Sequence, residues 1–149
     1  MSDITWKRVG LDYPKPKSEA GDGFDVLFED PALYDIIPYS WRDLFFFRFK
    51  QAAPADQVFI YEMTYDTNEN TGMPTVYIRA KKSGTGSQPL AVNSFYHAFD
   101  MNNFLWNLSP DSKNMVSFNI VFKTGVDKDG KDIYQSWAYN PMKYPLRDE

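Results

Sequence analysis

Two stretches of the chain alternate between apolar and polar positions in a way that predicts a β-hairpin. They are residues 57–65 (QVFIYEMTY) and 75–82 (TVYIRAKK), and a period of two residues is typical of a strand with one buried face. The loop between them, DTNENTGMP, is rich in turn-forming residues. Pairing the two strands would bring Glu62 near Arg79, as an exposed ion pair worth about 0.2–1 kcal/mol.

A second alternating pair follows in the last third of the chain. Within residues 115–124 (MVSFNIVFKT) every second side chain from Val116 to Phe122 is apolar, and the loop GVDKDGKD leads into residues 133–139 (IYQSWAY). The pattern predicts a second hairpin. The side chains expected to share one face of its second strand are Ile133, Trp137 and Tyr139.

Residues 41–50 (WRDLFFFRFK) fit two patterns. Asp43 could complete a capping box with the serine three residues before it, which favours a helix. The following phenylalanines instead alternate as in a buried strand, and we favour the strand. The phenylalanines expected on one side of it are Phe45, Phe47 and Phe49. Residues 4–9 and 24–28 also predict short strands.

A short helix is predicted over residues 31–37. Asp30 suits the N-cap and Pro31 the first helical position, whereas Pro38 ends the segment.

A longer helix is predicted over residues 93–108, with Asn93 or Ser94 as its cap, Pro110 beyond its end, and a break near Asn102-Asn103. The apolar residues at helical spacing are Phe95, Ala98, Phe99, Met101, Leu105 and Leu108.

These elements predict a mainly β, β-rich α+β fold. Six or seven strands without regular βαβ alternation favour an antiparallel β-sandwich or a partly open barrel, with one moderate and one short helix. Residues 1–149 are interpreted as a single domain. Residues 1–23 and 140–149 carry prolines, glycines and charges, and are interpreted as extended arms.

Composition restricts the function. The 12 Phe, 10 Tyr and 4 Trp favour sheet and a large aromatic core. The net charge of −4, without a long basic run, argues against binding of duplex nucleic acid. The N-terminus has no signal-peptide pattern and no segment has the length of a membrane-spanning helix, so we expect a soluble protein, cytoplasmic at synthesis, without membrane insertion.

The sequence contains few residues that could carry out catalysis or bind a metal or cofactor. There is no cysteine, and His97 is the only histidine. Ser94 and Asp100 flank it at three residues on either side, a spacing that does not build a triad. We therefore expect no enzyme, no cofactor and no conventional zinc site.

Two oxygen-rich loops leave calcium binding open as an alternative. Residues 66–72 resemble the beginning of an EF-hand loop, but Gly72 is at the seventh position rather than the sixth, and Tyr77 occupies the twelfth, where a Glu is needed. Residues 127–132 form a second such cluster. We interpret both as hairpin turns, because Asp, Asn and Gly favour tight reversals.

Our functional hypothesis is a non-catalytic structural or assembly protein that acts through self-association or a protein partner. Strand addition through the arms is the expected mode, and a viral or phage virion the first setting to test.

The alternative is a binding module for carbohydrate or single-stranded nucleic acid that uses exposed aromatic side chains. The candidate binding residues are Trp41, Tyr61, Tyr77, Trp106, Trp137 and Tyr139. The cations that could line a nucleic-acid groove are Arg8, Lys15, Lys17, Arg79, Lys81 and Lys82.

Overall fold

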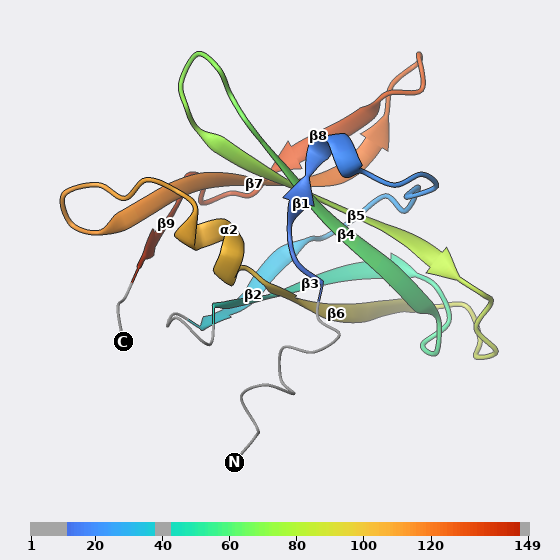
Figure 1. Cartoon of the computed structure of the whole chain (residues 1–149). Coiled ribbons are helices and arrows are strands. Elements are labelled where there is room, and N and C mark those ends of the chain that lie inside the picture. The colour runs from blue at the N-terminus through green and yellow to red at the C-terminus, as the bar shows by residue number, and fades with distance from the viewer. Residues whose placement is uncertain (1–11, 38–42, 147–149) are drawn as a thin grey trace.

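The computed structural model describes residues 12–37 and 43–146, and Figure 1 shows them as two β-sheets with little helix. The strand predicted at residues 4–9 lies outside the described residues, as does Trp41. The first half of the described chain forms β1 (Lys15–Pro16), η1 (Lys17–Glu19), β2 (Ala32–Ile37), β3 (Leu44–Ala52) and β4 (Val58–Thr67). The second half forms β5 (Pro74–Ser83), β6 (Val92–Asp100), α2 (Asn102–Trp106), β7 (Met115–Val126), β8 (Asp132–Ser136) and β9 (Met142–Pro145).

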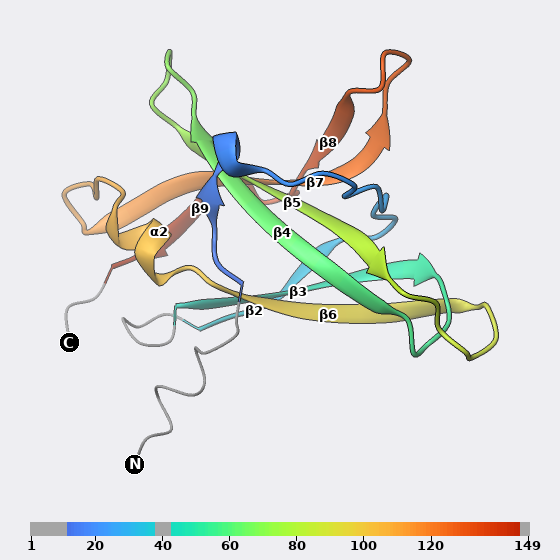
Figure 2. The ribbon, with the colours of Figure 1, turned by 45° about the vertical axis from the view of Figure 1, so that its right-hand side comes forward.

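The strands form a six-stranded and a three-stranded sheet. The larger has the order β1-β4-β5-β7-β8, with β9 beside β7, and the smaller has the order β2-β3-β6. The two sheets cross in Figure 2, and the described residues form no closed barrel. The predicted mainly β fold is confirmed, and most pairs are antiparallel. The pairs β1–β4 and β5–β7 are parallel.

Aromatic rings from both sheets meet in the core. Phe45, Phe47 and Phe49 are at most 1% exposed, as expected for the inner side of the predicted strand. Phe28 lies between the sheets, with its ring centroid 4.7 Å from that of Phe49 and 6.0 Å from that of Phe122. Full burial of one such side chain stabilises the fold by about 1.5–3 kcal/mol.

Both predicted hairpins are present, but the second strand of the later one ends at Ser136, so Trp137 and Tyr139 lie beyond it. The strands β4 and β5 pair with Glu62 opposite Arg79, and β7 pairs with β8. The expected exposure of the Glu62–Arg79 pair is wrong, because the Glu62 side chain is only 2% exposed. We call residues 12–28 the strap; its main chain at Gly21 contacts both side chains of this pair on the outer face of the six-stranded sheet.

The helix predicted over residues 93–108 is wrong for most of its length. Residues 92–100 form the strand β6, which pairs along all of β3, and only Asn102–Trp106 are helical. Phe95, Phe99 and Met101 fit a period of two as well as a helix, and all three are buried. Pairing with β3 decides between the patterns, because tertiary packing overrides local preference.

The short helix predicted over residues 31–37 is also wrong. Residues 32–37 form β2, which pairs with the other side of β3. Since β3 carries the most buried phenylalanines, covering both of its sides with strands satisfies its backbone groups inside the fold.

The ends of the described chain lie against its own sheets. Residues 24–28 are extended, as the sequence predicts, but contact the sheet through single bonds, from Val26 N to Ala80 O and from Phe28 N to Lys123 O, rather than as a strand. At the other end, β9 pairs with β7.

Candidate functional site

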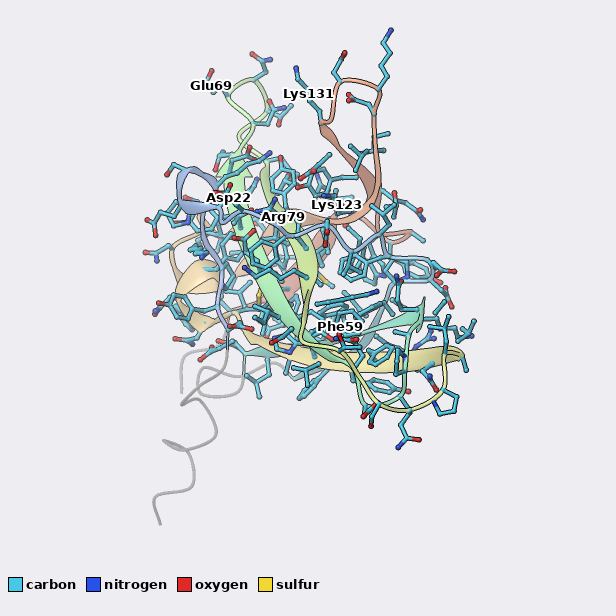
Figure 3. The ribbon with its side chains drawn as sticks, turned by 90° about the vertical axis from the view of Figure 1, so that its right-hand side faces the viewer. Asp22, Phe59, Glu69, Arg79, Lys123 and Lys131 are labelled. Carbon is cyan, nitrogen blue, oxygen red and sulfur yellow. The ribbon has the colours of Figure 1, made fainter. Side chains whose placement is uncertain are left out.

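A network of charged side chains lies on the outer face of the six-stranded sheet, beneath the strap. Arg79 Nε donates to Glu62 Oε1 at 2.9 Å, and Arg79 Nη1 lies 3.4 Å from Asp132 Oδ2. Lys123 Nζ lies 2.9 Å from Asp132 Oδ1. Figure 3 shows Arg79 and Lys123 on the body of the sheet, and Glu69 and Lys131 at the hairpin tips. Each charge in this network therefore has a partner of opposite sign.

The strap supplies the remaining partners through its main chain. Arg79 Nη2 donates to Gly21 O and Lys123 Nζ donates to Phe24 O, both at 2.8 Å, while Gly21 N donates to Glu62 Oε2 at 2.6 Å. A Cβ at position 21 would lie 3.0 Å from Phe24 Cε2 and 3.3 Å from Glu62 Oε2, so glycine permits this close approach. The network thus holds the strap on the sheet.

Burial and hydrogen bonding on this face of the sheet shift the pKa values of several side chains. Burial by itself raises the pKa of Asp132, but the bonds from Lys123 and Tyr134 and the nearby cations outweigh it and lower that pKa. Burial is the main cause that raises the pKa of Tyr134, with its bond to Asp132 adding to it. Burial and a bond to Asp66 raise the pKa of Tyr77 to about 12. These groups keep their usual charge at neutral pH.

His97 lies on a strand and not on a helix. Its Nε2 is 2.8 Å from Asp12 Oδ2, and its ring stacks on Tyr61 with centroids 4.0 Å apart. Ser94 and Asp100 lie an odd number of residues from His97, so the strand directs their side chains to the opposite face. Asp12, from the strap, was not foreseen as its partner.

The edge of β8 is the candidate site for protein contacts. The strand ends the order of the six-stranded sheet, and no further strand of the described chain pairs with its outer side. Trp137 N donates to Ile120 O of β7, so by alternation the backbone groups of Asp132, Tyr134 and Ser136 point away from β7. Such a row of backbone donors and acceptors can pair with another strand.

Exposed apolar side chains accompany this edge. Ile133 is 46% exposed and Tyr139 is 75% exposed. The Tyr139 ring packs edge-on against Trp137, with centroids 5.2 Å apart. The edge therefore offers both backbone hydrogen bonds and apolar area.

The candidate aromatic residues lie in separate surroundings. Tyr61 contacts core rings such as Phe47, at 5.6 Å between centroids. Tyr77 packs against Tyr134 on the outer face, at 5.0 Å. The structure brings Trp137 and Tyr139 together, but does not place them in one groove with Tyr61 or Tyr77.

Trp106, a further candidate, is 39% exposed, and its indole N–H contacts a polar cluster around the buried Asp43 that the sequence did not reveal. Its Nε1 donates to Asp43 Oδ2 at 3.3 Å, and Asn102 Nδ2 donates to the same oxygen at 2.8 Å. Tyr144 Oη donates to Asp43 Oδ1 at 2.7 Å. Asp43, only 2% exposed, thus connects the beginning of β3 to α2 and β9 rather than capping a helix. No pattern in the sequence predicts this role, because it depends on which distant segments lie next to Asp43 in the fold.

Most cations of the candidate nucleic-acid groove lie near carboxylates. Lys15 is 3.8 Å from Glu62, and Lys17 is 3.9 Å from Asp66. Lys81 Nζ lies 4.6 Å from the centroid of the Phe24 ring. Arg8 lies outside the described residues. The Lys15 and Lys17 side chains are still 40% and 43% exposed, and Lys82 is exposed as well.

The two oxygen-rich loops connect the strands of the hairpins. Asn68 Oδ1 accepts bonds from Asn70 N and Thr71 N, and Asp127 Oδ1 accepts bonds from Asp129 N and Lys131 N. Within residues 12–37 and 43–146, no group of three His, Cys, Asp or Glu side chains is placed to hold a metal ion. The same part of the chain contains no helix with the length and apolarity needed to cross a membrane.

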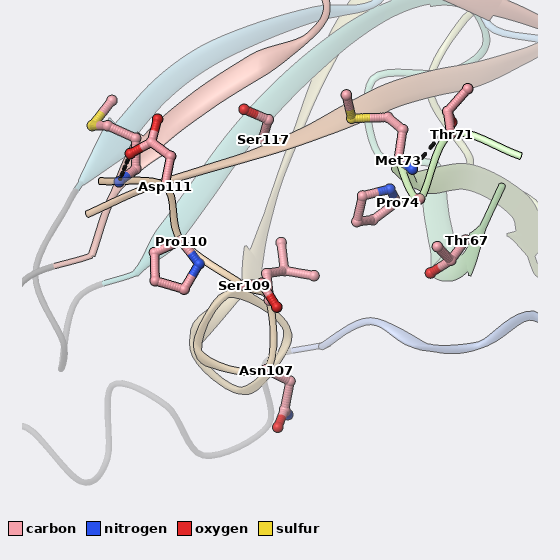
Figure 4. A pocket seen from close by; sticks show the side chains of 12 residues that line it. Thr67, Thr71, Met73, Pro74, Asn107, Ser109, Pro110, Asp111 and Ser117 are labelled. Carbon is pink, nitrogen blue, oxygen red and sulfur yellow. Dashed lines mark hydrogen bonds between the residues drawn. The ribbon is translucent and has the colours of Figure 1, made fainter. Parts of the chain in front are cut away.

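A groove of about 410 Å³ lies between the β4–β5 loop and the connection from α2 to β7 (Figure 4). One wall carries Thr67, Thr71 and Met73, and the other carries Asn107 and the segment that follows it. A smaller cavity of about 190 Å³ adjoins it, because four residues line both. The shared residues are Thr67, Pro74, Asn107 and Leu108.

Known proteins resemble this chain in fold but not in sequence. No family model matches it, and no curated protein matches its sequence. An uncharacterised protein from Parabacteroides merdae has a similar structure, with a TM-score of 0.57 and 15% identity over 85% of this chain. A NigD-like immunity protein from Bacteroides caccae gives a TM-score of 0.55 and 14% identity over 91% of this chain. The chain covers only 63% and 64% of these two proteins, and at such identities the likeness shows the fold alone.

Proposed function

We propose that this chain is a non-catalytic protein that acts through protein–protein contacts, with a second copy of itself as the partner and the free edge of β8 as the contact. The observation that carries the proposal is the outward row of backbone groups at Asp132, Tyr134 and Ser136. In an antiparallel pairing centred on Tyr134, Asp132 lies opposite Ser136 of the second copy. Such a pairing is self-complementary, as a two-fold contact requires, and forms up to about six backbone hydrogen bonds.

Exposed apolar area supports the same edge. Ile133 lies on β8 and Tyr139 in the turn that follows it, and both exposed side chains would be duplicated across a two-fold axis. A five-residue strand buries little area, so the association belongs to the weak class of interfaces. It is therefore expected at millimolar rather than nanomolar concentration.

The non-catalytic part of the proposal is supported by the polar clusters. The charges near Arg79 neutralise one another beneath the strap, and Asp43 is engaged by Tyr144 and Asn102. One neighbour in fold is described as an immunity protein, a description that names no catalytic activity. The virion setting remains a prediction from the sequence.

Sedimentation velocity over a concentration series tests the proposal, with Ile133→Lys as the variant. A lysine at an edge strand opposes pairing with another strand, so we expect concentration-dependent dimerisation of the wild type and its loss in this variant. Val58→Lys is the matched control, because Val58 is 60% exposed on β4 and should dimerise like the wild type. A wild type that stays monomeric at millimolar concentration would overturn the proposal, as would a variant that dimerises unchanged.

A further inference from the structure

The groove between the β4–β5 loop and the α2–β7 connection has the size of a ligand site. Its volume of about 410 Å³ falls within the range of small-molecule sites. Its shape is set by local hydrogen bonds in both walls. Met73 N donates to Thr71 Oγ1 at 3.2 Å in one wall, and Met115 N donates to Asp111 Oδ1 at 3.0 Å in the other (Figure 4).

The groove presents hydroxyl groups with spare hydrogen-bonding capacity. The Thr67, Ser109 and Ser117 side chains line it and form no hydrogen bond with any other residue of the described chain. A hydroxyl both donates and accepts. Three such groups around one cavity therefore suit a ligand that itself carries several groups of both kinds.

The charge of the lining argues against an anionic ligand. Asp111 is the one charged side chain among the residues that line the groove. Its Oδ1 is occupied by Lys113 N at 2.8 Å and by Met115 N, bonds that lower the pKa of the carboxyl. No cation lines the cavity, so a phosphate or carboxylate would find no counter-charge there.

Apolar side chains complete the lining. Met73, Pro74 and Leu108 contribute to the main groove, and Tyr65 and Phe104 line the adjoining cavity. Carbon–hydrogen faces of a sugar ring pack on such surfaces, while its hydroxyls need partners that donate and accept. Neutral hydroxyl groups beside apolar and aromatic side chains match this combination.

We infer that this groove binds a neutral oligosaccharide. The site differs from the exposed aromatic set considered from the sequence, since none of the five members of that set in the described part of the chain lines the main groove or the adjoining cavity. It is also independent of the β8 edge, so a failure of this inference leaves the self-association proposal as it stands.

An array of neutral oligosaccharides built from glucose, mannose, xylose, galactose and N-acetylglucosamine tests the inference. The wild type should bind at least one, and titration calorimetry with that oligosaccharide should give a dissociation constant in the micromolar to millimolar range. Ser109→Tyr, which fills the groove, should abolish binding. Ser117→Ala, which removes one hydroxyl, should weaken binding about tenfold. Circular dichroism confirms that each variant is folded.

Ser94→Tyr is the matched control, because Ser94 is an exposed serine on β6, outside the groove. It should bind like the wild type. The inference is wrong if no neutral oligosaccharide binds, or if Ser109→Tyr binds as tightly as the wild type. A peptide array tests the other class of ligand. The inference would also be overturned if peptides bind the wild type but not Ser109→Tyr while no oligosaccharide binds.

Discussion

Lys123 shows what a single residue contributes beneath the strap. Its side chain is only 6% exposed, and its Nζ bonds both Asp132 and the Phe24 carbonyl. A lysine at this depth is stable only because both partners replace the water it loses. The long stem also reaches the strap from β7, which no shorter cation could do.

Replacing Lys123 with methionine should lower the free energy of unfolding by about 2 kcal/mol, because the change leaves Asp132 Oδ1 and the Phe24 carbonyl without their donor. Urea unfolding followed by fluorescence measures this loss. Lys131→Met is the matched control, since Lys131 lies at the exposed tip of the same hairpin (Figure 3) and should change stability by less than about 0.5 kcal/mol. Equal losses of unfolding free energy in the two variants would show that the buried contacts of Lys123 do not stabilise the fold.

At the scale of elements, one carboxylate ties two connecting loops together. Asp56 lies between β3 and β4, and it accepts bonds from Ser87 N, Ser87 Oγ and Gln88 N, in the loop between β5 and β6, at 2.7–3.0 Å. Gly86 permits this contact, because a Cβ there would lie 2.7 Å from Asp56 Oδ1. The loops at this end are thereby held by side-chain chemistry that no strand periodicity reveals.

This contact predicts a dependence of stability on pH. The bonds from Gln88 and Ser87 lower the pKa of Asp56 from its ordinary 3.8 to about 2. A lowered pKa in the folded state means that the stabilisation is present above the unfolded pKa and is lost as the pH falls through the folded one. Asp56→Asn should therefore unfold at a lower temperature than the wild type at pH 7, and the gap should narrow between pH 4 and pH 2. Thermal unfolding across this pH range is the measurement, and a gap that stays constant would contradict the prediction.

For the whole molecule, the two sheets share one continuous core. Residues of the strap, of both sheets and of α2 belong to the same buried cluster, including Phe28, Phe47, Phe122 and Leu105. Neither sheet can bury its inner face without the other. The fold should therefore behave as one cooperative unit.

Cooperative unfolding can be tested with probes from different parts of the molecule. Urea unfolding followed by far-ultraviolet circular dichroism reports on the strands of both sheets, and tryptophan fluorescence reports on side-chain packing, including that of Trp106 and Trp137. We expect the two transitions to coincide. Two separated transitions would mean that the sheets unfold independently.

The sequence predicted those elements whose pattern is local. The strands of the two hairpins, and the alternation of Phe45, Phe47 and Phe49, are visible within ten residues, because a strand places alternate side chains on opposite faces. The predictions at residues 31–37 and 93–108 failed because local capping signals and helical spacing also occur there, and the pairing of both segments with β3 outweighs them.

The sequence by itself therefore determined a mainly β, aromatic-rich fold with two hairpins, and the absence of any cysteine chemistry. Only the tertiary structure decided the burial of Glu62, the partner of His97, and the position of Asp43, whose bond to Tyr144 spans 101 residues. It also decided that the outer edge of β8 pairs with no other strand of the described residues, and that a hydroxyl-lined groove lies beside α2. The physical reason is that periodicity reports which face of a segment is buried, whereas burial, pairing and cavities depend on which distant segments cover it.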